Sequence, residues 1–267
     1  MSFKEHNNRD ISKKLAEYIT GIELRKYVAK KVKQYVNLEN PTVFDGAVGS
    51  GQLEQFINPA ILYGVDVQEN SINSAKENFK NTELEVKSFF EYEKENLIVD
   101  CVIMNPPFSI KFKDLSELEQ KNIQSEFEWK KSGCVDDIFV LKSLKYTKRF
   151  GFYILFPGVG YRRTEEIFRK FIGNNLAELN RIDNAFTDTG ISVIELWISG
   201  VKKNLELDLF LVQECGANID VSGNIKKLKS ICKEFERKLR CQRKYVSSMS
   251  VSEKQSKLLS LFEATQR

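Results

Sequence analysis

The segment Met104 to Phe108, Met-Asn-Pro-Pro-Phe, contains residue types that folding alone explains poorly. It follows the apolar run Cys101-Val102-Ile103, which is typical of a buried strand. Pro106 and Pro107 have no backbone N–H, and each fixes its own φ at about −65°. A sheet normally excludes such a pair. The two prolines therefore form a rigid corner without hydrogen-bond donors, with an amide side chain before it and an aromatic ring after it.

A second group of such residues follows the apolar run 42–44. The turn Asp45-Gly46-Ala47-Val48-Gly49-Ser50-Gly51 lets the backbone approach a ligand closely. Asp66 ends the run 61–66 and is placed to bind ribose hydroxyls. The spacing is not GxGxxG and no GK[ST] follows, which disfavours dinucleotide and phosphate-cradling sites. Asp45 would repel a phosphate and suits a ligand with a positive end, such as an amino group or a sulfonium; a turn without a ligand is the alternative.

Other kinds of chemistry have little support in the composition. The chain has one histidine, His6, in a polar stretch, and five cysteines without a Cys-x-x-Cys pair: Cys101, Cys134, Cys215, Cys232 and Cys241. Neither a disulfide framework nor a zinc site is indicated, and Cys101 is expected to be a small buried side chain. We therefore expect chemistry without a histidine base, a cysteine nucleophile or a metal held by the protein.

The elements that must position these residues alternate along the chain. The apolar patterns predict strands at 42–44, 61–66, 83–89, 97–104, 151–156, 176–182, 192–199 and 205–212. They predict helices at 11–36 with a break at Gly21, from Gln52 onward, and at 70–79, 138–150, 164–174 and 225–245, whereas 109–136 shows no clear period. Alternating strands and helices indicate an α/β fold with a mainly parallel sheet covered on both faces. Ligands of such sheets bind at the carboxyl ends of the strands, where both motifs lie.

Length and charge suggest two parts. The chain has 267 residues, 42% hydrophobic and 29% charged, which fits one large domain with a small appendage. The composition changes near Val221, so we expect a domain at 1–221 and a helical segment at 222–267, with twelve Lys and Arg against four Glu in the latter. A basic segment suits a polyanionic partner, and a solvated helix surface is the alternative. No run is long enough to span a membrane and the N-terminus is polar, so a cytoplasmic protein is expected.

Taken together, the motifs resemble a known family. Phe-Asp-Gly-Ala-Val-Gly-Ser-Gly-Gln at 44–52, Gly-Val-Asp at 64–66 and Asn-Pro-Pro-Phe at 105–108 resemble S-adenosylmethionine-dependent amino-methyltransferases, in particular DNA adenine-N6 methyltransferases. Phe-Thr-Asp-Thr-Gly-Ile-Ser at 186–192 is similar to a segment late in the catalytic domain of type I and type IIG modification subunits of restriction-modification systems. The resemblance covers about residues 11–212, and the motif order is the gamma arrangement. It implies the Rossmann-like class I methyltransferase fold.

The resemblance also implies a mechanism that explains the corner. The N6 nitrogen of adenine is a poor nucleophile because its lone pair is delocalised into the ring. The Asn105 side-chain oxygen and the Pro106 carbonyl would accept from its two hydrogens, and Pro106 and Pro107 would hold them rigid. Phe108 would stack on a base flipped out of the duplex. The methyl group then passes in line from sulfonium to nitrogen, which needs positioning and neither a base nor a metal.

For the cofactor, S-adenosylmethionine, the resemblance implies that Asp45 and the glycines hold the methionine part, Asp66 the ribose and Phe89 the adenine side. The full implied set is Asp45, Gly46, Ala47, Gly49, Gly51, Asp66, Val67 and Phe89. Ser88 stands where the family usually has an aspartate, and would accept from the adenine amino group less strongly. The alternatives are that the glycines only shape a turn and that Phe89 and Phe108 are core aromatics.

Substrate and partners are less defined. DNA is the expected partner, through the basic segment 222–267, with the polar stretch 109–136 as a second candidate contact. The basic segment could instead form a homodimer or dock a separate specificity subunit. An RNA base, a protein glutamine amide, or a non-catalytic cofactor-binding subunit of a restriction-modification system are the alternative functions.

Overall fold

A computed structural model describes residues 3–4, 20–108, 110–182, 193–199 and 219–220. The chain divides into two units, Met1–Ile225 and Lys226–Arg267, and the second lies wholly outside the described residues. The same holds for the predicted boundary near Val221, the helices at 11–18 and 225–245, the strand at 205–212 and the motif at 186–192. No described helix is long and apolar enough to cross a membrane.

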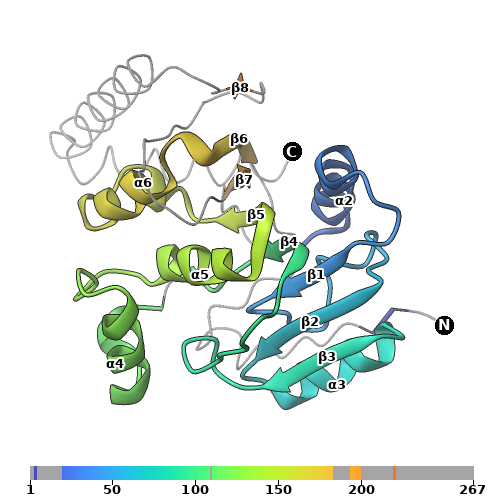
Figure 1. Cartoon of the computed structure of the whole chain (residues 1–267), viewed down its shortest axis with the longest axis horizontal. Helices are drawn as coiled ribbons and strands as arrows, with labels where there is room; N and C mark the ends of the chain where they lie inside the picture. The colour runs from blue at the N-terminus through green and yellow to red at the C-terminus, as the bar shows by residue number, and fades with distance from the viewer. Residues whose placement is uncertain (1–2, 5–19, 109, 183–192, 200–218, 221–267) are drawn as a thin grey trace, which may run out of the picture. The chain divides into compact units, whose positions relative to one another are not determined.

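The first unit is built on one sheet whose described strands follow the order β3-β2-β1-β4-β5-β7-β6-β8 (Figure 1). Their bounds are β1 Thr42–Asp45, β2 Ile61–Asp66, β3 Thr82–Val86, β4 Val99–Met104, β5 Thr147–Leu155, β6 Leu176–Ile182, β7 Val193–Ser199 and β8 Ile219–Asp220. Strands β3, β2, β1, β4 and β5 run parallel to one another, and β7 runs antiparallel to β5 and β6. The predicted mainly parallel α/β sheet is confirmed, with the class I methyltransferase strand arrangement.

Helices α2, Ile22–Val36, and α3, Glu69–Asn78, cover one face of the sheet. Apolar side chains of α2 recur every four residues and form one stripe: Leu24, Val28, Val32 and Val36. They belong to one buried cluster with sheet residues that include Val43, Leu62, Cys101 and Phe152. Gly21, the predicted break, is the N-cap of α2. Cys101 is buried, as expected.

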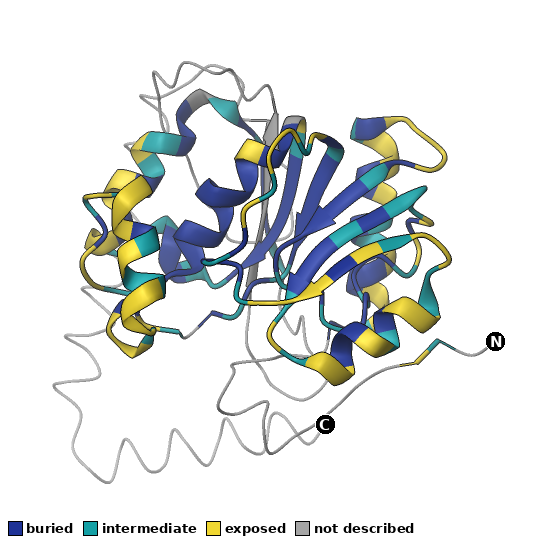
Figure 2. Cartoon of the chain, turned by 60° about the horizontal axis from the view of Figure 1, so that its bottom comes forward, coloured by how far each residue is buried: buried dark blue, intermediate teal, exposed yellow. Residues whose placement is uncertain are grey.

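Helix α5, Asp136–Ser143, covers the opposite face and is buried along its whole length (Figure 2). Because neighbouring strand residues point to opposite faces, Phe44 lies on this side while Val43 lies on the other. Phe44 packs in an aromatic cluster with Phe89, Phe90, Tyr92, Phe139 and Tyr146. Helices on both faces of the sheet are thereby confirmed.

The stretch after the corner, for which no period was visible, folds back on itself. Lys111 pairs with Cys134, and Phe112 N–H donates to the Gly133 carbonyl at 2.9 Å. These contacts close the base of residues 111–134, which we call the insert. Within it lies α4, Glu117–Glu126, whose first turn is stabilised by a capping box. Ser116 Oγ accepts from Glu119 N–H at 3.2 Å, while the Glu119 carboxylate accepts from Ser116 N–H at 2.8 Å.

A buried ion pair joins α2 to β6. Lys31 Nζ donates to Glu178 Oε1 at 2.8 Å, and Tyr35 Oη donates to Glu178 Oε2 at 2.7 Å. Asn180 Nδ2 adds a contact of 3.1 Å to Glu178 Oε1. With both charges buried and hydrogen-bonded, loss of either partner would leave an uncompensated charge, which costs about 3–5 kcal/mol.

Three predicted elements differ from the structure. Residues 51–57 form successive turns and no helix, because Asn58, at φ 54°, and Pro59 end the segment before a helix can propagate. The third strand ends at Val86, so Phe89 lies in a turn. The apolar run 138–150 is divided between α5, which ends at Ser143, and β5, which begins at Thr147.

Candidate functional site

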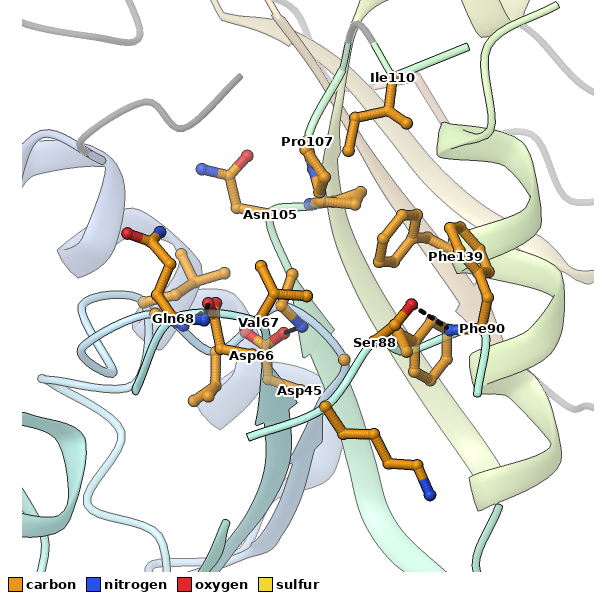
Figure 3. A pocket seen from close by; sticks show the side chains of 18 of the residues that line it. Asp45, Asp66, Val67, Gln68, Ser88, Phe90, Asn105, Pro107, Ile110 and Phe139 are labelled. Atoms are coloured by element: carbon orange, nitrogen blue, oxygen red, sulfur yellow. Dashed lines mark hydrogen bonds between the residues drawn. The ribbon is translucent and has the colours of Figure 1, made fainter. Parts of the chain in front are cut away.

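A pocket lies at the carboxyl ends of β1, β2 and β4 (Figure 3). Because these strands are parallel neighbours, the residues that follow them meet at one edge of the sheet. Of the residues predicted from the sequence, the pocket is lined by Asn105, Pro106, Pro107, Phe108, Asp45, Gly46, Ala47, Gly49, Asp66, Val67 and Phe89. The structure therefore brings the corner and the glycine turn, 60 residues apart in the chain, into one site.

The nitrogen of the Asn105 carboxamide has a hydrogen-bond partner, whereas its oxygen has none among the described residues. Its Nδ2 donates to Thr20 Oγ1 at 3.0 Å, whereas its Oδ1 is buried and has no hydrogen-bond partner among the described residues. Thr20 is in turn fixed through its backbone, because Arg25 Nε donates to its carbonyl at 2.6 Å and its N–H donates to Gln52 Oε1 at 3.3 Å. A buried acceptor without a donor is costly unless a ligand supplies one, so Asn105 Oδ1 indicates a bound N–H or O–H group.

The rest of the corner is less exposed than its predicted role suggests. Pro106 is buried and Pro107 half-buried, which fits a rigid support. Phe108 is 5% exposed and belongs to the hydrophobic cluster on the α2 side of the sheet, although it also lines the pocket. Its packing is thus established, and stacking of its ring on a base stays a prediction.

Asp45, at the end of β1, shares a buried environment with a second carboxyl. Its Oδ1 accepts from Ala47 N–H at 2.7 Å, and burial raises its pKa to about 7. Burial and the neighbouring Asp45 charge raise the pKa of Glu54 well above its usual range. Because an ionised Asp45 disfavours ionisation of the buried Glu54, the two carboxyls titrate as a pair and can leave one negative charge at the base of the pocket.

Asp66, at the end of β2, is oriented by two backbone donors. Gly49 N–H donates to Oδ2 and Gln68 N–H to Oδ1, each at 2.9 Å. These contacts fix the carboxylate at the pocket wall, where Figure 3 shows it beside Val67 and Gln68. The Val67 side chain is 55% exposed, so an apolar surface lies open next to an anchored carboxylate. This pair suits a sugar diol followed by a flat apolar ring.

The three glycines of the turn are required for different physical reasons. A Cβ on Gly46 would lie 2.8 Å from the Phe89 ring and 2.9 Å from Met104 Cε, so this position admits no side chain. Gly49 has φ +53° and nothing within 4 Å of the added atom, so its backbone conformation is what requires glycine. Gly51 does not line the pocket, and its φ of +77° and the Phe79 ring require glycine, so a part of Gly51 in cofactor binding stays a prediction.

The far wall of the pocket contains Glu119 and Phe139, which sequence reasoning missed, beside Ser88 and Phe89, which it named. Ser88 Oγ donates to Glu119 Oε1 at 2.5 Å, and all four residues line the pocket. Phe139 stacks on Phe89, with ring centroids 5.3 Å apart and planes at 19°. The Ser116-x-x-Glu119 spacing was a readable helix signal, but nothing in the sequence places Glu119 beside Ser88. Thr20 and Gln52 were likewise missed.

The described residues contain no group of three or more His, Cys, Asp or Glu that could hold a metal ion. The polar groups of the pocket are instead the charge shared by the Asp45 and Glu54 carboxyls, the anchored carboxylate of Asp66 and the amide oxygen of Asn105. Such a set suits an organic ligand with a positive end and hydroxyl groups.

Comparisons with known proteins identify a similar domain. Residues 37–134 match the family model of the methyltransferase small domain. The matched segment is less than half of the chain, but it contains the glycine turn, Asp66 and the corner. No curated protein sequence matches the chain significantly.

Solved structures share the fold at low sequence identity. A Listeria monocytogenes protein described as a class I S-adenosylmethionine-dependent methyltransferase is 16% identical, with a TM-score of 0.59, and the match covers 71% of this chain and 62% of that one. A type I restriction-modification methyltransferase subunit from Streptococcus thermophilus is 19% identical, with a TM-score of 0.58 and coverage of 84% and 55%. A Pyrococcus horikoshii protein described as an RNA methyltransferase is 19% identical, with a TM-score of 0.52 and coverage of 75% and 94%.

The chain thus spans 62% and 55% of the first two structures. The matched domain and the fold support methyl transfer and S-adenosylmethionine as the cofactor. The pocket residues fit this cofactor: Asp45 would hold its ammonium group, Asp66 its ribose and Val67 one face of its adenine.

Proposed function

We propose that the chain methylates the exocyclic N6 amino group of adenine in DNA, using S-adenosylmethionine. The observation that carries the proposal is the Asn105 carboxamide, whose Oδ1 is buried, lines the pocket edge and has no donor among the described residues. An amino group of a base supplies the donor that this oxygen lacks.

The chain's own residues would act by positioning. Asn105 Oδ1 accepts one hydrogen of the amino group, and the Pro106 carbonyl is proposed to accept the other, which concentrates the lone pair on nitrogen. The two prolines limit movement of both acceptors, and Thr20 holds the amide. When bound, the cofactor supplies a methyl group on a sulfonium, a leaving group that needs no metal or covalent intermediate. The proton released on methylation leaves with water or through the pocket carboxyls.

A decisive experiment uses the purified full chain with radiolabelled cofactor. Label should enter unmodified double-stranded DNA and should be recovered as N6-methyladenine after digestion. The Asn105→Ala variant should lose at least about 100-fold in rate while binding S-adenosylhomocysteine as the wild type does, because the amide acts on the acceptor and not on the cofactor. Label found only in RNA or protein, or full activity of Asn105→Ala, would refute the proposal.

One observation favours a second candidate, an amino group of an RNA base. The chain spans 94% of the protein described as an RNA methyltransferase, against 55% of the type I modification subunit. The corner would perform the same chemistry on either nucleic acid. Assaying unmodified transcripts beside DNA in the experiment above separates the two.

Contact with DNA is also a proposal. The basic segment 222–267 is proposed to bind phosphates and residues 109–136 to form a further contact, with a homodimer or a separate specificity subunit as alternatives. The first of these segments lies outside the described residues. Residues 110–136 of the second segment are described, and α4 within them contacts the pocket wall through the hydrogen bond between Glu119 and Ser88.

A further inference from the structure

We propose that Glu119, on the insert after the corner, makes the pocket select a cofactor whose purine carries an amino group and reject one carrying a carbonyl at the same position. This inference rests on the cofactor placement proposed above. It concerns the wall opposite Asn105, where Figure 3 shows Ser88 and Phe90.

The hydrogen bonds of Ser88 carry the argument. A hydroxyl group has one hydrogen to donate and two lone pairs that accept. Ser88 Oγ donates its hydrogen to Glu119 Oε1 at 2.5 Å, since an ionised carboxylate has none to give. Phe90 N–H donates weakly to the same Oγ at 3.3 Å, which leaves a lone pair. With Glu119 present, Ser88 can therefore meet a ligand only as an acceptor.

Glu119 is itself held in place by the fold of the insert. Its Oε2 accepts from both Ser116 N–H and Ser116 Oγ at 2.8 Å, which turns Oε1 toward Ser88. One helical turn later, Asn122 Nδ2 donates to the Phe90 carbonyl at 3.2 Å. Residues three apart share a helix face, so α4 lies against the turn that carries Ser88 through two side chains. The base of the insert is closed by the pairing of Lys111 with Cys134.

The ligand edge that reaches this wall follows from the other anchors. Asp66 is placed for the ribose and Val67 for one purine face, and both line the same pocket as Ser88 and Glu119. An amino group there would donate to the acceptors of Ser88 and Glu119. A carbonyl oxygen would face acceptors only. Ser88 and Glu119 are half-buried, and two acceptors that meet there without a hydrogen between them are unfavourable.

The test compares two probes by calorimetry on the full chain: S-adenosylhomocysteine, with a 6-amino purine, and S-inosylhomocysteine, with a 6-oxo purine. Wild type should bind the amino compound about tenfold more tightly or better. In Glu119→Gln the new side-chain amide can donate to Ser88 Oγ. The Ser88 hydroxyl is then free to donate its hydrogen to the carbonyl of the 6-oxo purine, so the ratio of the two affinities should fall toward one. Ser88→Ala should lower the ratio as well.

Glu117→Gln is the matched control. It removes the same charge from the same first turn of α4, but Glu117 is exposed and does not line the pocket. Its affinity ratio should equal that of wild type. Equal affinities in wild type, or an unchanged ratio in both Glu119→Gln and Ser88→Ala, would overturn the inference even if DNA is methylated. Binding of neither probe to wild type would overturn the cofactor placement as well, whereas discrimination without DNA methylation would refute only the proposed substrate.

Discussion

Asn105 Nδ2 donates to Thr20 Oγ1 at 3.0 Å across 85 residues of sequence, and this bond joins the corner after β4 to the residue that precedes the N-cap of α2. Thr20 contributes nothing to the acceptor chemistry. It occupies one end of the carboxamide, so the other end can face a ligand. The backbone contacts of Thr20 with Arg25 and Gln52 keep that arrangement in place.

Thr20→Val tests this positioning role. The variant keeps the shape of the side chain but removes the hydroxyl, so Asn105 loses the partner that orients it. We expect kcat to fall roughly tenfold, the equivalent of one hydrogen bond, with a much smaller change in KM for the cofactor. Thr20→Ser restores the hydroxyl and should recover most of the rate. A loss that Thr20→Ser fails to recover would show that packing matters and the hydroxyl does not.

Cofactor binding should depend on pH through Asp45. Its pKa of about 7 in the free site means that the carboxyl is largely protonated at pH 6 and ionised at pH 8. A positive ligand group prefers the ionised form, so S-adenosylhomocysteine should bind about tenfold more weakly at pH 6 than at pH 8. Calorimetry in buffers of different ionisation enthalpy should also detect proton release on binding below pH 7.

Glu54→Gln is the matched variant for that experiment. A glutamine amide keeps the size of the side chain but cannot take up or release a proton. The pH dependence that remains should therefore come from Asp45 alone, as a single ionisation. A binding curve identical to that of wild type would mean that Glu54 does not share in the charge of the site.

Stability should change with pH in the opposite direction. Asp45, Glu54 and Asp136 have pKa values raised by burial, so the folded chain binds more protons than the unfolded one between pH 4 and 7. Their stabilising contribution is complete below the unfolded pKa and is lost as pH rises through the folded one. The Tm should therefore fall on the order of 5 °C from pH 5 to pH 8, and less in Glu54→Gln. A Tm that rises over this range would contradict the assignment.

Gly46→Ala tests how tightly the turn packs against the aromatic cluster. The added Cβ would lie 2.8 Å from the Phe89 ring, which stacks on Phe139, so the ring must move. We expect a loss of about 1–3 kcal/mol in the free energy of unfolding and weaker cofactor binding. Phe89→Leu in the same background should restore part of the loss, a coupling that a double-mutant cycle measures. Independent, additive effects would show that the two residues do not meet.

The sheet and most of the pocket could be predicted from the sequence because their signals are local. β2 and β6 match the predicted ranges, and β2 is a short apolar run ended by a polar residue. The corner and the glycine turn converge because parallel strands place their carboxyl ends together. The apolar run at 138–150 was misassigned as one helix, because short apolar runs do not distinguish helix from strand.

The wall made by Glu119 and the contact of Thr20 could not be predicted in this way. Each depends on a segment that folds back onto a turn far away in the chain, and no spacing records such a meeting. Ser88 and Glu119 are 31 residues apart, and neither stands in a motif that refers to the other. For a related reason the sequence does not show the packing of Gly51 against the Phe79 ring, because a turn glycine and a ligand glycine look alike in a sequence.

The ion pair of Lys31 and Glu178 has a consequence for when the domain can fold during its synthesis. A ribosome releases α2 before the described strands, and the carboxylate that meets Lys31 emerges 147 residues after it. Throughout that interval the lysine must stay hydrated, and the apolar stripe of α2 lacks the strands β4 and β5 that cover it. Translation thus delivers α2 long before the strands that it packs on exist, and the nascent domain reaches its native packing only when synthesis is well advanced.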